Sequence, residues 1–264
     1  KVTIEMALYT AKVDAERRQA EKRQELSIKI LELLNHSKES IDAIRDILIL
    51  IKENIGFEAV GIRLREGEDF PYYHANGFPA EFVEAERNLC ARDQRGEIIR
   101  DSQGNPCLEC MCGNVICQRT DSSLPFFTDK GSFWTNSTTE LLATTTEADR
   151  QVRTRNRCNG EDYESVALIP LRSNDKIIGL LQLNDRRKNM FTLEMIHFFE
   201  GIGDSIGIAL DHKRAGGALK KSEGKYRTLF EAESDAVIIV DEETADLLDA
   251  NEAALQLYGY SHEE

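Results

Sequence analysis

The feature that most constrains the fold is the pattern of residues 163–215. Two apolar segments, VALIPLR and KIIGLLQLN, flank a polar turn at residues 173–175, which predicts a β-hairpin. An amphipathic helix follows, with Thr192 as its N-terminal cap. We therefore expect a pair of antiparallel strands joined to a helix that runs out of the domain. The apolar residues of that helix recur at helical spacing, at Met195, Phe199, Ile202, Ile206 and Leu210.

The first eighty residues predict two helices followed by two strands. Residues 4–35 contain neither Pro nor Gly, and they predict a long helix that is exposed at first, then packed, and that offers a dimer seam. A second amphipathic helix follows, and Gly56 fits its C-terminal stop. Residues 57–66 alternate like a strand with one solvent-exposed face. Residues 71–78 predict its hairpin partner, with a turn at Asn76-Gly77.

Composition and charge exclude several classes of function. The chain of 264 residues is 41% apolar and 30% charged, as in ordinary soluble globular proteins. Its net charge of −14 argues against nucleic-acid partners, which need clustered Lys and Arg. No apolar run approaches the roughly 20 residues of a membrane span, and no signal peptide opens the chain, so we expect a cytoplasmic location. The chain starts inside a helical pattern and stops in SHEE without a closing element, which indicates a segment of a longer protein.

Four of the six cysteines lie within GNPCLECMCGNVICQR, residues 104–119. In a reducing compartment, clustered cysteines serve metal binding or redox chemistry more often than disulfide formation. The spacing C-x2-C-x-C-x4-C supplies the four thiolates that zinc or an iron–sulfur cluster needs, if the segment turns back on itself. The alternative is unliganded thiols, one of them packed as a small apolar residue. The candidate metal ligands are Cys107, Cys110, Cys112 and Cys117.

The order of the predicted elements resembles that of a GAF domain, over residues 25–212. The stretch from YESVALIPLRSNDKIIGLLQLND to FTLEMIHFFEGIGDSIGIAL is similar to the last two strands and final helix of that family, particularly in sensor histidine kinases. Residues 226–264 resemble the start of a PAS domain, after a linker helix at residues 213–225. Residues 1–24 resemble the tail of a receiver domain and a linker helix. The implied fold class is α+β, a GAF-type antiparallel sheet flanked by helices, with long helical linkers and an incomplete PAS-like segment.

The resemblance implies a regulatory role in a two-component signal-transduction protein. The GAF pocket would sense redox state, a gas or a small ligand, and signal along its C-terminal helix to the PAS domain and a downstream kinase. Phosphorelay output would belong to the parent histidine kinase. The N- and C-terminal helices would pair across a parallel homodimer. Gly216-Gly217 and Gly224 would interrupt the exit helix and form a hinge, because each Gly costs a helix roughly 1 kcal/mol relative to Ala.

Some GAF sensors hold haem or another tetrapyrrole, which gives a second interpretation of the cysteines. Cys117 or Cys158 would then anchor or ligate the cofactor. His74 carries an imidazole that suits zinc and iron, and Trp134 is expected in the pocket wall. Residues 153–160 place three arginines beside Cys158, and these would attract an anionic ligand, lower the pKa of that thiol, or form a solvated loop. The candidate cofactors are therefore haem, an iron–sulfur cluster or zinc.

Two rival functions stay open at this stage. Some small GAF proteins reduce free methionine sulfoxide with clustered cysteines, which requires a thiol of low pKa facing the pocket and a second thiol within reach. The other rival is a GAF domain that binds no ligand and serves in dimerisation and spacing. The segment itself offers no identified catalytic site.

Overall fold

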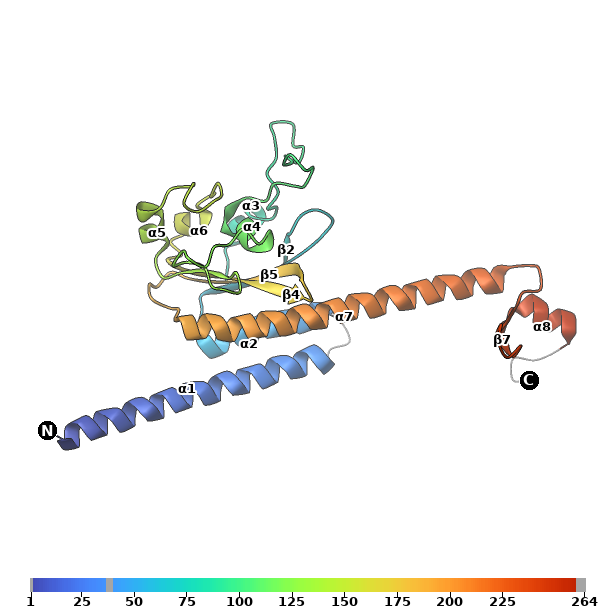
Figure 1. Cartoon of the computed structure of the whole chain (residues 1–264), viewed down its shortest axis with the longest axis horizontal. Coiled ribbons are helices and arrows are strands. Elements are labelled where there is room, and N and C mark those ends of the chain that lie inside the picture. Colours follow the sequence, from blue (N-terminus) through green and yellow to red (C-terminus); the bar gives the residue numbers. More distant parts are fainter. Residues whose placement is uncertain (1, 37–39, 260–264) are drawn as a thin grey trace. The chain divides into compact units, whose positions relative to one another are not determined.

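The computed structural model describes residues 2–36 and 40–259, which belong to two compact units with their boundary between Asp211 and His212 (Figure 1). The elements before the boundary are α1 (Val2–His36), α2 (Ser40–Ile55), β1 (Ala59–Leu64), β2 (Tyr72–Asn76), α3 (Ala80–Ala85), α4 (Cys110–Ile116), β3 (Phe133–Thr135), α5 (Thr138–Thr144), α6 (Arg157–Gly160), β4 (Ser165–Ser173) and β5 (Lys176–Asp185). Helix α7 (Leu193–Ala232) belongs to both units, and β6 (Ile238–Val240), β7 (Leu247–Ala250) and α8 (Glu252–Tyr258) belong to the second.

The first unit is built on a five-stranded sheet in the order β2-β1-β5-β4-β3, in which every neighbouring pair is antiparallel. The predicted hairpin of β4 and β5 is confirmed, and it closes at the pair Ser173 and Lys176. Strand β1 lies beside β5, with Val60 opposite Leu183. The antiparallel sheet with flanking helices confirms the expected α+β fold class.

One face of the sheet packs against helices. Figure 1 shows α1, α2 and α7 on this side, and α3 to α6 on the other. Alternate strand residues such as Ile62, Ile169 and Leu181 meet the apolar faces of α2 and α7. The end of α1 joins the same core through Leu26 and Ile30, as its sequence pattern predicts. Burial of these aliphatic side chains is the main stabilising contribution to this half of the domain.

The opposite face of the sheet is also buried, which corrects the prediction of a solvent-exposed face for residues 57–66. Every residue of β1 is buried, and Arg63 is only 1% exposed. Short helices and loops between β2 and β4 cover this face and form a second apolar core. Arg63 is accommodated there because its guanidinium donates to the carbonyl oxygens of Phe70 and Glu86 and stacks on Tyr72, 3.7 Å from the ring centre.

Helix α7 packs closely on β4 through two glycines. A Cβ atom at Gly203 would lie 2.8 Å from the carbonyl oxygen of Pro170, and one at Gly207 would lie 2.1 Å from that of Arg172. The helix continues through residues 216–224, so the predicted interruption by glycines there is wrong. Good helix formers flank those glycines, and a cost of roughly 1 kcal/mol each leaves the helix intact. Neither α7 nor any other helix in the described ranges is long and apolar enough to cross a membrane.

The second unit holds together around one buried amide. The Asn251 side chain accepts hydrogen bonds from the backbone N–H groups of Val237 and Ala254, each at 2.9 Å, and donates to the carbonyl oxygens of Phe230 and Asp235. It thereby ties the end of α7 to the two-stranded sheet of β6 and β7 and caps α8. The strand and short helix predicted for this segment are present.

Replacing Gly207 by Ala tests the contact between α7 and the sheet. The new methyl group would overlap the Arg172 backbone, so we expect the free energy of unfolding to fall by about 2 kcal/mol or more. Gly201→Ala on the same helix is the matched control, because nothing lies within 4 Å of its Cβ position. This control should gain up to about 1 kcal/mol from helix propensity. Urea unfolding measures both, and equal effects of the two substitutions would contradict the packing described.

Candidate functional site

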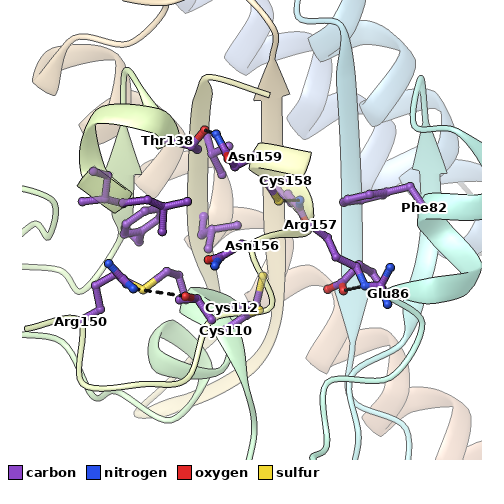
Figure 2. Close-up of a pocket in the computed structure, with 18 of the residues that line it drawn as sticks. Phe82, Glu86, Cys110, Cys112, Thr138, Arg150, Asn156, Arg157, Cys158 and Asn159 are labelled. Atoms are coloured by element: carbon purple, nitrogen blue, oxygen red, sulfur yellow. Dashed lines mark hydrogen bonds and ion pairs between the residues drawn. The ribbon is translucent and has the colours of Figure 1, made fainter. Parts of the chain in front are cut away.

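A cavity lies on the face of the sheet opposite α2 and α7. Its enclosed volume is about 70 Å³. Strand residues Tyr72, Val166, Leu168 and Gln182 form its floor. Helices α3 to α6 and their loops form its walls (Figure 2). The apolar wall residues are Phe82, Met111, Phe133, Leu141 and Leu142.

Three thiols from two separate segments line this cavity. Cys110 and Cys112 come from α4, and Cys158 comes from α6 (Figure 2). Burial raises the pKa of each thiol to about 12. The neighbouring thiols add to this effect, because ionising one would place a negative charge near the others. At neutral pH all three are therefore neutral thiols.

The local structure of α4 follows from its sequence. Cys110 opens the helix with φ at +60°, and its backbone N–H donates to the carbonyl oxygen of Arg153 at 3.0 Å. Gly113 allows the helix to approach Leu108, whose carbonyl carbon would lie 2.7 Å from a Cβ atom. Asn114 is buried, and its amide donates to the carbonyl oxygen of Arg150 at 2.6 Å. These contacts fix the two α4 thiols against the segment that carries Cys158.

The arginines predicted beside Cys158 form ion pairs instead of lowering its pKa. Arg155 binds Glu109 at 2.8 Å, and Arg157 lies 3.0 Å from the Glu86 carboxylate. Arg153 extends into solvent, with 81% of its side chain exposed. Burial raises the pKa of the Glu86 carboxyl, against the opposing effect of Arg155 and other arginines. Two of the three arginines of residues 153–160 are thus paired with carboxylates of the protein itself.

The predicted cofactor residues do not all meet. Cys158 lines the cavity, whereas Cys117 is exposed at the C-terminal cap of α4. His74 lies on β2 opposite Ile62, and burial together with the charge of Arg45 lowers its pKa. Trp134 lies on β3 and packs against the core shared with α2 and α7. The lining of the cavity includes Cys158 but not the other three.

The four predicted metal ligands are likewise divided. Cys110 and Cys112 line the cavity, and Cys107 lies in the preceding loop, where its backbone N–H donates to the carbonyl oxygen of Ile99. Within the part of the chain that the structure describes, no three His, Cys, Asp or Glu side chains are grouped as a metal site requires. The four-cysteine metal site therefore stays a prediction.

A buried carboxylate connects the cavity wall to α7. Glu200 is 2% exposed, and its Oε1 accepts hydrogen bonds from the hydroxyls of Thr128 at 2.5 Å and Ser132 at 2.7 Å. Its Oε2 lies 2.9 Å from Nδ1 of His197. Ser132 directly precedes Phe133, which lines the cavity. Hydrogen bonds to a single side chain of α7 thus hold the segment that ends in Phe133.

Sequence reasoning missed two charged residues of the cavity, Glu86 and Arg150. Both are 5% exposed, and Figure 2 places them at opposite sides of the view with Cys110 and Cys112 between them. Glu86 is the C-terminal cap of α3 and Arg150 lies in the loop before α6, and a charged residue at such a position normally indicates exposure. Only the tertiary packing reveals their role.

Alkylation rates of the thiols test the burial of the site. A thiol with a pKa near 12 gains about tenfold more thiolate per pH unit, so the rates at Cys112 and Cys158 should climb steadily from pH 7 to 10. The exposed Cys117 should react faster at every pH. Peptide mapping by mass spectrometry after iodoacetamide treatment resolves each site. A plateau near pH 8 for the cavity thiols would contradict this environment, and Cys117→Ser should remove the fast phase alone.

The chain resembles known proteins both in sequence and in fold. Residues 40–210 match the GAF domain family, and residues 224–264 match a PAS domain. The GAF domain of a phosphoenolpyruvate-protein phosphotransferase from Coxiella burnetii superposes with a TM-score of 0.52 at 13% identity, covering 75% of this chain and 98% of that one. The free methionine-R-sulfoxide reductase of Neisseria meningitidis, bound to its substrate, gives 0.48 at 11% identity, covering 74% and 91%.

One relative by sequence is the methyl sulfide methyltransferase-associated sensor of Methanosarcina acetivorans. It is 29% identical over 92 residues, which cover 35% of this chain and 9% of that protein. The chain thus spans less than a tenth of the length of this relative. The GAF match extends over most of the chain and coincides with the sheet, the cavity and the packed part of α7. The chain belongs to the GAF domain family.

Proposed function

We propose that this chain is the cytoplasmic sensory segment of a two-component signal-transduction protein, and that the thiol-lined cavity is its sensing site. The observation that carries the proposal is the convergence of Cys110, Cys112 and Cys158 on one cavity. The GAF and PAS matches and the relative named as a sensor support the signalling context. The receiver-like opening of the chain and a histidine kinase output belong to the same proposal.

Neutral buried thiols suit two sensing chemistries. Two of them can be oxidised to a disulfide, with peroxide reduced to water, and a thiol can restore them. Alternatively, on deprotonation they can ligate haem iron or a soft metal. The donors that the cavity offers are Cys110, Cys112 and Cys158, and most of its lining is apolar; a tetrapyrrole would require this cavity of about 70 Å³ to widen. Zinc or iron–sulfur binding by the four predicted cysteines would further require Cys107 and Cys117 to join them.

The signal would leave through α7. Glu200 links this helix to the wall segment that ends in Phe133, and Lys130 of the same segment lies 3.5 Å from Asp204. A ligand or disulfide that moves the wall would change the contacts that hold α7. Because α7 is continuous to Ala232, a change between two positions of its first half could be passed along the helix.

The proposal includes a homodimer formed by the N- and C-terminal helices. Ile28 and Leu31 on α1 and Ile208 on α7 are large apolar residues that stay exposed in the single chain. Apolar surface of this kind on long helices is typical of helical dimer interfaces.

The reductase alternative receives less support from the same thiols. A nucleophilic cysteine needs a lowered pKa, whereas burial raises the pKa of all three cavity thiols to about 12. A sensor that responds slowly to oxidant or holds a cofactor does not have this requirement. Turnover of free methionine sulfoxide by the purified protein would favour the enzyme instead.

Anaerobic purification followed by oxidation tests the proposal. We would record the visible spectrum and the iron and zinc content, then add stoichiometric hydrogen peroxide and map the thiols. The expected result is either a chromophore or a reversible disulfide that depends on Cys110, Cys112 or Cys158, as judged by single serine variants.

Cys117→Ser is the matched control and should change neither signal. Loss of metal or colour in that variant would instead support the predicted four-cysteine metal site. A colourless, metal-free protein whose cavity thiols resist peroxide while Cys117 is oxidised would overturn the proposed role of the cavity thiols.

A further inference from the structure

Arg150 is a buried cation that forms no ion pair with a carboxylate among the described residues. Its guanidinium donates to the carbonyl oxygen and the hydroxyl of Thr145, both at 2.7 Å, and to the hydroxyl of Thr154 at 3.4 Å. Its Nε is buried and has no hydrogen-bond acceptor among the described residues. The side chain is 5% exposed and lines the cavity.

The carboxylate that senses the charge of Arg150 is that of its neighbour Asp149: hydrogen bonds from Thr146 lower the pKa of Asp149 most, and Arg150 lowers it to a smaller extent. Asp149 is exposed, and its Oδ2 accepts hydrogen bonds from the backbone and hydroxyl of Thr146. Glu147 accepts from the backbone N–H of Thr154. Glu86, the acidic residue of the cavity lining, is engaged by Arg157, and Figure 2 shows it at the opposite side of the view from Arg150.

The other arginines near the cavity differ from Arg150 in their partners or in their position. Arg155 binds Glu109, and Arg157 lies against Glu86. Arg63 has carbonyl acceptors and the Tyr72 ring, and it does not line the cavity. A buried charge is costly unless a partner of opposite sign or strong acceptors offset its desolvation. Arg63 likewise has only neutral acceptors and an unpartnered Nε, but it lies outside the cavity lining, whereas Arg157 lines the cavity but pairs with Glu86. Of these four arginines, Arg150 alone lines the cavity without an ion-pair partner among the described residues.

We propose that the ligand of this cavity carries a carboxylate on an apolar body, and that Arg150 binds the carboxylate. The inference rests on the proposed function, since it names the ligand class of the same site. A guanidinium presents donors in a geometry that matches a carboxylate. Phe133, Leu141 and Leu168 provide apolar surface for the rest of the ligand. A free carboxylic acid and a tetrapyrrole with carboxylate side chains share this chemistry.

Protection of the cavity thiols from alkylation tests the inference with simple probes. Hexanoate carries the carboxylate on an apolar chain, hexanamide is its uncharged counterpart, and inorganic phosphate is an anion without an apolar body. We expect saturating hexanoate to slow iodoacetamide labelling of Cys112 and Cys158 at least fivefold relative to hexanamide or phosphate. A protein purified with a tetrapyrrole absorption band would already hold the carboxylate, and hexanoate would then protect only after the pigment is extracted.

Variants of Arg150 separate a binding role from a structural one. Arg150→Gln should abolish the advantage of hexanoate, and Arg150→Lys should retain part of it because the charge remains. Arg157→Gln is the matched control and should keep the discrimination, since Arg157 pairs with Glu86. Circular dichroism checks that each variant is folded. If Arg150→Gln does not fold, the three probes compared on the unmodified protein and on Arg150→Lys still test whether Arg150 binds the carboxylate.

Three outcomes would overturn the inference: equal protection by hexanoate and hexanamide, phosphate protecting as well as hexanoate, or no protection by any probe. Equal protection by the two organic probes would leave the cavity as a binding site of neutral ligands. The proposed function is judged separately, because the peroxide response of the serine variants requires none of these probes.

Discussion

Burial of both faces of the five-stranded sheet is the constraint on which the rest of the structure depends. Helices α1, α2 and α7 cover one face with aliphatic side chains. The long polar segment between β2 and β4 must cover the other, although it has little regular structure of its own. The short helices α3 to α6 and the loops between them form this second layer, and the cavity lies within it.

The two sides of the sheet are linked in a way that suits a sensor. Cysteines from α4 and α6 reach the cavity, and the wall that includes Phe133 is joined by its neighbouring hydroxyls to Glu200 on α7. The contact is short-range and buried, so it is little screened by solvent. Gly203 and Gly207 bring α7 close enough to the sheet for this contact to form. Sensing and transmission would therefore share one rigid domain.

Much of this fold could be predicted from the sequence, because β4, β5 and α7 have strong hydrophobic periodicity. The site could be predicted only in part. The cluster at residues 104–119 identified Cys110 and Cys112, but spacing alone could not separate them from the exposed Cys117. Arg63 and Arg150 escaped notice because polar residues normally indicate an exposed position. Arg63 donates to carbonyl groups of other segments, at Phe70 and Glu86, whereas the acceptors of Arg150 are nearby in sequence, at Thr145 and Thr154. In neither case does the hydrophobic pattern mark the position as buried.

Hydrogen exchange in the reduced and peroxide-treated protein tests the central claim most directly. The claim is that the state of the cavity thiols is coupled to α7 through Glu200. We predict altered exchange in residues 126–133 and in the first half of α7, in addition to α4 and α6. Changes confined to the segments that carry the cysteines, with α7 unaffected, would contradict the account.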